Sequence, residues 1–205
     1  PKSALARYAD NPARQDLEAL GRMADVHVAL NAVLTPHKEI VRVLFGAPVA
    51  VMEAGIPLVS EIYEVPVAQP CDLVVVAPGG APKDLNLYQA QKALAHASRV
   101  TKAAGAIILV AACPEGIGSR GYERWMLEGD VQSYADVFAK FEREGFSVGP
   151  HKAVLIARDA DRLQGIWLVS ELASDLVRRL LLTPASLEAA LAEALEGLPD
   201  NAHVG

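Results

Sequence analysis

Hydrophobic residues follow different patterns in the two parts of this chain. In the first third, apolar residues recur at helical spacing or alternate with polar ones, as at Val26, Val28 and Leu30. Such patterns are typical of amphipathic helices and half-buried strands. Further along, the continuous apolar runs 73–77 and 107–111 are typical of strands buried on both faces. The pattern therefore predicts two structural regions.

The first region is predicted to contain two helices and a β-hairpin. Asn11 followed by Pro12 is a favourable helix start, because Asn caps the helix and Pro is tolerated in its first turn. Turn residues near Thr35-Pro36 separate two strand-like segments and indicate an antiparallel hairpin. The expected elements are helices over residues 12–24 and 48–63 and strands near 26–30 and 40–45.

The second region alternates strands with helices, which predicts a parallel sheet covered by helices. Segment 152–159 fits a strand or a helix, and Gly149-Pro150 before it favours the helix. The expected strands are 73–77, 107–111 and 166–169, and the other expected helices are 86–98, 120–127, 131–144, 172–180 and 187–196.

These patterns predict an α/β fold class with a Rossmann-like three-layer domain. We place this domain at residues 68–197, after a helix and hairpin segment from a second domain at residues 1–67. Residues 198–205 form a return segment that ends just as a strand begins, which suggests truncation. The segment 1–67 is interpreted as the remnant of an N-terminal domain.

Composition narrows the classes of function. The chain has 205 residues and a net charge of −6, which argues against binding along a nucleic-acid backbone. No apolar run reaches the roughly 18 residues that a membrane helix needs. The two cysteines do not form a disulfide framework or a C-x-x-C pair. We expect a cytoplasmic protein without nucleic-acid or membrane partners.

The strongest local signal follows the first buried strand. Gly79 and Gly80 let the backbone approach a ligand at the carboxyl end of a strand, where open α/β sheets bind ligands. Tyr88 and Lys92 share a helix face, and Gln89 lies close to both in sequence. Together they offer hydrogen bonds and a cation for a carboxylate. A tight turn followed by an amphipathic helix with a solvated lysine is the structural alternative.

The same segment resembles a signature of the nickel-dependent lactate racemase family. Residues 78–93 read P-G-G-A-P-K-D-L-N-L-Y-Q-A-Q-K-A. Similarity continues in V-L-T-P-H-K-E-I at 33–40, W-L-V-S-E-L at 167–172 and P-A-S-L-E-A-A at 184–190. The resemblance covers nearly the whole chain and corresponds to the C-terminal part of the family.

The resemblance implies a two-domain racemase or epimerase acting on 2-hydroxy acids. In the family, a nickel pincer nucleotide tethered to a lysine accepts the substrate hydride, and two histidines act as acid and base. A Tyr-Gln-x-x-Lys helix holds the substrate, which implies substrate contacts for Tyr88, Gln89 and Lys92 here. The expected partners are a small 2-hydroxy acid and the N-terminal, cofactor-binding domain of the same protein.

The resemblance also implies that the reacting groups lie upstream of this chain. The family's cofactor lysine, nickel ligand, catalytic histidine pair and an arginine belong to its N-terminal domain. The five histidines here form no H-x-H or i, i+4 pair, so we expect no metal site and no catalytic residue. We expect the isolated chain to be inactive and the full-length protein to carry the nickel pincer nucleotide.

Other motifs leave alternatives open. Residues 116–121 fit G-x-G-x-x-G, which suggests an NAD-dependent dehydrogenase domain, although residues 113–115 separate the glycines from the strand. Cys113 is a candidate nucleophile or a small buried side chain. Trp125 is a candidate cleft-lining residue or a core residue. A third hypothesis is a domain that binds a carboxylate without turnover.

Overall fold

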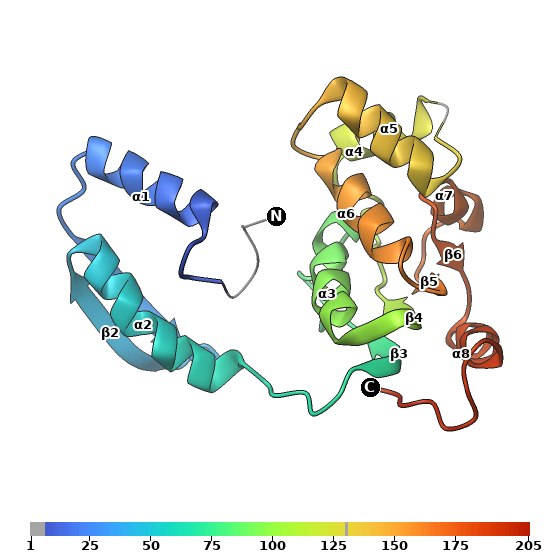
Figure 1. The fold of residues 1–205 in the computed structure, drawn as a ribbon, viewed down its shortest axis with the longest axis horizontal. Coiled ribbons are helices and arrows are strands. Elements are labelled where there is room, and N and C mark those ends of the chain that lie inside the picture. The colour runs from blue at the N-terminus through green and yellow to red at the C-terminus, as the bar shows by residue number, and fades with distance from the viewer. Residues whose placement is uncertain (1–6, 130) are drawn as a thin grey trace. The chain divides into compact units, whose positions relative to one another are not determined.

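The computed structural model describes residues 7–129 and 131–205, and over this range the chain forms two compact units. The N-terminal unit is Pro1–Pro66 and the C-terminal unit is Val67–Gly205 (Figure 1). The boundary lies one residue before the position expected from sequence. That the N-terminal unit is part of a cofactor-binding domain stays a prediction.

The N-terminal unit consists of two helices and an antiparallel hairpin. Its elements are α1 (Pro12–Met23), β1 (Ala29–Leu34), β2 (Ile40–Gly46) and α2 (Pro48–Tyr63). The first strand was expected near residues 26–30, and that placement was wrong. The turn closes where the Thr35 amide donates to the Glu39 carbonyl at 2.9 Å, so the residues next to it form the ladder. Val26 and Val28 precede the hairpin and are exposed.

The C-terminal unit is an α/β domain, as predicted. Its elements are β3 (Cys71–Val76), α3 (Leu87–Val100), β4 (Thr101–Val110), α4 (Arg120–Leu127), α5 (Tyr134–Glu144), α6 (His151–Ala160), β5 (Gly165–Val169), α7 (Ser174–Arg179), β6 (Thr183–Pro184) and α8 (Leu187–Glu196). Over the described residues of this unit, four parallel strands lie in the order β3-β4-β5-β6. The ambiguous segment 152–159 is helical.

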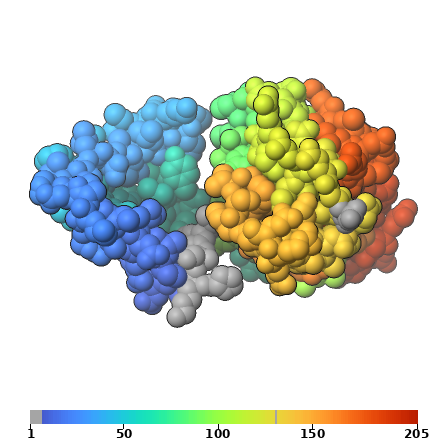
Figure 2. Space-filling view, turned by 90° about the horizontal axis from the view of Figure 1, so that it is seen from above, coloured from blue at the N-terminus to red at the C-terminus, as the bar shows by residue number. Residues whose placement is uncertain are grey.

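The sheet separates two apolar layers because successive side chains of a strand point to opposite faces. Ile107 and Leu109 of β4 pack in the larger core with α3 to α7, whereas Ile108 packs with Ala190 and Ala194 of α8. In Figure 1, α8 lies apart from α3 and α6. Helices α5 and α6, yellow to orange, form much of the face of this unit seen in Figure 2. The domain therefore has three layers.

The last residues add to the sheet beside β3. Val204 forms a parallel bridge with Leu73, and the Val75 amide donates to the Gly205 carbonyl at 2.9 Å. The return segment 198–205 thus belongs to the C-terminal unit. Among the described residues, no helix is both long and apolar enough to cross a membrane.

Candidate functional site

Two loops meet at the carboxyl edge of the parallel sheet. One joins β3 to α3 and contains Gly79 and Gly80, whose φ angles are 94° and 73°. Glycine adopts this left-handed backbone without the steric cost that a side chain brings. The other loop joins β4 to α4. Because parallel strands end at the same edge, both loops lie where such sheets bind ligands.

Backbone hydrogen bonds join the two loops. The Cys113 amide donates to the Asp84 carbonyl at 2.9 Å, and the Glu115 amide donates to the Leu85 carbonyl at 2.8 Å. At the start of α3, the Leu87 and Tyr88 amides donate to the carbonyls of Gly116 and Ile117 at 3.1 and 3.0 Å. These bonds satisfy amides that a helix start otherwise leaves without partners. The first turn of α3 is therefore fixed in place.

The glycine motif at 116–121 has a packing role in this arrangement. Asn86 caps α3, because its side-chain oxygen accepts from the Gln89 amide at 3.1 Å. A Cβ on Gly118 would lie 2.1 Å from Cγ of Asn86, so only glycine lets the loop approach this closely. The close approach to Asn86 accounts for Gly118, and the positive φ of 75° accounts for Gly116, so neither glycine requires a nucleotide. No observation here favours the dehydrogenase alternative.

The three predicted substrate contacts lie on the first two turns of α3. Nζ of Lys92 donates to Oε1 of Gln89 at 2.6 Å, so these two side chains meet. Lys92 is exposed, and Tyr88 and Gln89 are half-buried. The Tyr88 ring turns toward α6, where its centroid is 6.3 Å from that of His151. The group presents a cation and hydrogen-bonding side chains on one part of the surface.

Sequence reasoning missed Lys152, which lies in the first turn of α6 next to Tyr88. Its Nζ is 4.9 Å from the Tyr88 ring centroid and donates to Oε1 of Gln91 at 2.7 Å. Burial lowers the pKa of Lys152, and the charge of Lys92 lowers this pKa further. One sequence signal existed: Lys152 follows Gly149-Pro150 by two positions, which places a cation at the end of a helix where the dipole disfavours it.

Two other candidates lie inside the C-terminal unit. Trp125 is buried in the larger core, and its Nε1 donates to Oε2 of Glu144 at 2.7 Å. Cys113 is 1% exposed, and burial, with the charges of Asp84 and Glu171, raises the pKa of its thiol to about 11. A protonated, enclosed thiol is a poor nucleophile. The contacts of both residues are those of core residues.

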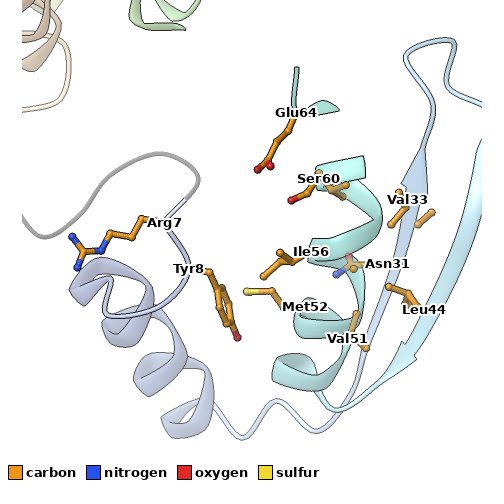
Figure 3. A pocket seen from close by; sticks show the side chains of 13 residues that line it. Arg7, Tyr8, Asn31, Val33, Leu44, Val51, Met52, Ile56, Ser60 and Glu64 are labelled. Carbon is orange, nitrogen blue, oxygen red and sulfur yellow. The ribbon is translucent and has the colours of Figure 1, made fainter. Parts of the chain in front are cut away.

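The N-terminal unit contains a separate, mostly apolar pocket of about 550 Å³. It lies between α2, the hairpin and the segment before α1, and Tyr8, Met52 and Ile56 extend toward it (Figure 3). The Tyr8 hydroxyl donates to Oε1 of Glu53 at 3.4 Å. None of the predicted site residues lines this pocket. Within residues 7–129 and 131–205, no three His, Cys, Asp or Glu side chains are grouped to hold a metal.

The fold and the site together define a class of protein. The C-terminal unit is a three-layer α/β domain whose parallel sheet presents lysine, glutamine and tyrosine side chains beyond its carboxyl edge. Residues 67–205 match the family described as the lactate racemase C-terminal domain, and the chain belongs to this family.

Individual relatives agree with this assignment. The chain is 29% identical over 177 residues to the lactate racemase of Thermoanaerobacterium thermosaccharolyticum, a match to 86% of this chain and 41% of that protein. It is 33% identical over 122 residues to the lactate racemase of Lactiplantibacillus plantarum, covering 60% of this chain and 28% of the relative. The chain thus spans less than half the length of these curated relatives.

Solved structures show the same similarity. The lactate racemase apoprotein from Thermoanaerobacterium thermosaccharolyticum aligns with a TM-score of 0.86 at 28% identity, covering 95% of this chain and 47% of that one. A protein from Thermotoga maritima aligns with a TM-score of 0.66 at 17% identity, covering 96% and 52%. The second similarity shows the fold alone.

Proposed function

We propose that this chain is the substrate-holding, C-terminal part of an enzyme that interconverts the enantiomers or epimers of a 2-hydroxy acid. The observation that carries the proposal is the Tyr88, Gln89 and Lys92 group on α3, within a domain of the lactate racemase family. Relatives in this family are named lactate racemases. The activity is that of the full-length protein, and the isolated chain is inactive.

The chemistry of the group suits a 2-hydroxy acid. A carboxylate is the common feature of these substrates, and the Lys92 ammonium offers it a charge-assisted hydrogen bond. Gln89 carries an amide that both donates and accepts, and Tyr88 carries a hydroxyl. Donors on a fixed helix hold a small substrate in one orientation, which accelerates its reaction with a neighbouring group. We assign substrate binding to these three side chains.

The site also has a rigid support. Asn86 and the 113–118 loop fix the first turn of α3 through the hydrogen bonds described above. The hydrogen bond from Lys92 to Gln89 spans one turn of the same helix. A site on a rigid helix keeps its geometry better than one on a mobile loop. In this proposal Gly79 and Gly80 shape the neighbouring loop and let its backbone approach the substrate.

The family implies a nickel pincer nucleotide, which supplies the hydride-accepting chemistry when it is bound. The described residues of this chain do not fit a nickel site, because no group of three ligating side chains exists among them. We therefore derive no step through the cofactor and assign its binding, with the acid and base histidines, to the rest of the full-length protein. That N-terminal domain is the partner we propose for this chain.

The test uses the full-length protein produced together with the cofactor-making proteins. Enantiopure 2-hydroxy acids are offered, and chirality is followed by chiral chromatography. We expect racemisation of at least one acid, and we expect Lys92→Ala to lower kcat/KM about 10- to 100-fold, since the substrate carboxylate loses its charge-assisted hydrogen bond. Lys102→Ala is the matched control, because Lys102 lies near the start of β4 and forms an ion pair with Asp72 at 2.8 Å.

Each result has a distinct meaning. Racemisation that Lys92→Ala leaves unchanged would keep the activity and remove Lys92 from the site. Binding of an acid by the cofactor-loaded protein without any change in chirality would favour the carboxylate-binding domain over the enzyme. An equal loss in the Lys102→Ala control would show that the Lys92 effect is structural.

A further inference from the structure

A second lysine lies beside the proposed substrate-binding group. Lys152 is 8% exposed, and its ammonium lies over the Tyr88 ring and donates to Gln91, a residue that is 1% exposed. Nε2 of Gln91 is buried without a hydrogen-bond partner among the described residues. Tyr88 therefore borders a largely buried charge, and the residue that accepts from this ammonium has an unused amide donor.

Three features disfavour a positive charge at this position. The ammonium is largely removed from water, Lys92 places a second cation close enough to act on it, and the first turn of α6 carries the positive end of the helix dipole. Among the described residues, Lys152 forms no ion pair with a carboxylate. Lysine is rarely this buried without a counter-charge, and a buried, perturbed cation beside a cluster of polar side chains is a candidate for ligand binding.

The two lysines have donors to spare. An ammonium has three N–H donors, and the hydrogen bonds found use one from Lys92, to Gln89, and one from Lys152, to Gln91. A substrate with a single carboxylate neutralises one of these two charges. A second anionic group on the same substrate would neutralise the other and relieve the repulsion between them.

We propose that Lys92 and Lys152 together make the site selective for 2-hydroxy acids with a second carboxylate. Lys92 binds the carboxylate next to the reacting carbon, and Lys152 binds the distal one. This proposal rests on the proposed function and specifies its substrate class. It makes Lys152 the residue that distinguishes dicarboxylic from monocarboxylic hydroxy acids.

The first test is binding, measured by calorimetry on the full-length protein with malate, lactate and succinate. We expect malate to bind at least about tenfold more tightly than lactate, which is the effect of one additional charge-assisted contact. Lys152→Met, which keeps the length and removes the charge, should abolish this preference by weakening malate binding at least about tenfold more than lactate binding. Lys152→Arg keeps the charge and should retain part of the preference for malate.

Lys140→Met is the matched control, because Nζ of Lys140 also lies over an aromatic ring, at 4.6 Å from the centroid of the Trp125 ring. This variant loses a similar contact outside the site and should keep the malate preference. Equal loss of malate and lactate binding in Lys152→Met, or no preference in the wild-type protein, would overturn the proposal. Succinate, which lacks the hydroxyl, should bind more weakly than malate and still depend on Lys152.

Racemisation assays on the same proteins separate this proposal from the proposed function. A malate preference in binding without racemisation of any acid would refute the enzyme and keep the selectivity. Racemisation of lactate with no effect of Lys152→Met on the ratio of kcat/KM values for the two acids would keep the enzyme and refute the selectivity. We expect malate to be racemised with the higher kcat/KM.

Discussion

The two units of this chain differ in what their secondary structure is packed against. Among residues 7–66, Val33 and Val51 are the buried apolar side chains, and none of the described residues of α1 is buried. Leu20 on this helix is 59% exposed. In the C-terminal unit, the segment 106–109 of β4 is fully buried, with apolar layers on both sides.

The helices of the two units are therefore stabilised differently, by local contacts in the N-terminal unit and by tertiary packing in the C-terminal unit. Helix α1 has an Asn11 cap, an Arg14–Glu18 ion pair and the Arg14 guanidinium 4.0 Å from the Tyr8 ring centroid. These contacts are local, and a 12-residue helix is marginal when only local contacts support it. Helix α3 adds the burial of Leu87 and Leu94, each worth roughly 1.5–3 kcal/mol. The exposed apolar face of the N-terminal unit fits the proposal that further polypeptide packs there in the full-length protein.

The largest expected difference between the units appears when one leucine in each is replaced by alanine. Leu94→Ala should lower the free energy of unfolding of the C-terminal unit by about 3 kcal/mol, since it leaves a cavity in a closed core. Leu20→Ala should change the stability by less than about 0.5 kcal/mol, as exposed substitutions do. Urea unfolding followed by circular dichroism and by tryptophan fluorescence measures both, because Trp125 and Trp167 lie in the C-terminal unit.

If Leu20→Ala lowered the free energy of unfolding of this 205-residue chain by about 2 kcal/mol, the contrast between the two units would be wrong, since α1 would then be buried. In the full-length protein the same substitution becomes a test of the proposed N-terminal partner. A greater cost there than in this chain would support the proposal that polypeptide covers α1.

The next effect is the pH dependence of the Cys113 contribution. Burial raises the pKa of its thiol to about 11 from an ordinary value of 9.0, so the folded state holds the proton more tightly than the unfolded state. The stability gained is complete below pH 9 and is lost as the pH rises through 11. We expect wild type to lose about 1–2 kcal/mol relative to Cys113→Ala over this range.

Urea midpoints of the two proteins at pH 8, 9.5 and 11 measure the difference. Parallel pH profiles would mean that the thiol is as accessible to water in the folded state as in the unfolded one. The comparison with Cys113→Ala cancels the titration of lysines and tyrosines elsewhere in the chain.

The smallest effect compares two helix caps made by the same residue type. Asn86→Ala should cost the C-terminal unit about 1 kcal/mol, because the Gln89 amide loses its acceptor. Asn11→Ala removes the corresponding cap of α1 and should leave the tryptophan-detected transition unchanged. Amide hydrogen exchange should show faster exchange in α3 for the first variant and in α1 for the second. Equal effects on the tryptophan transition would mean that the two units unfold as one.

Local pattern was sufficient to predict most elements. The cap at Asn11 and the continuous apolar runs of β3 and β4 depend on neighbouring residues, which the sequence displays directly. Strand β1 was misplaced because Val26 and Val28 alternate as a strand does but precede the ladder. The hairpin turn, and the burial of Val33, decide where pairing starts, and neither follows from alternation.

The residues of the candidate site also divide into those that local sequence could predict and those that it could not. Tyr88, Gln89 and Lys92 could be proposed from sequence, because a helix places residues three and four apart on one face. The place of Lys152 beside this group could not be predicted, since it is 60 positions from Lys92 and only the packing of α6 against α3 brings it to Tyr88. The packing role of Gly118 was also hidden, because it depends on contact with Asn86 from another loop.

By itself, the sequence determined the order of helices and strands, the parallel sheet, the family and the helix that carries the predicted substrate contacts. These features follow from short-range periodicity, caps and a continuous motif. The tertiary structure alone decided which side chains are enclosed, how the 113–118 loop fixes α3, and where the second lysine lies. Those properties arise from contacts between segments far apart in the chain, and no local pattern records them.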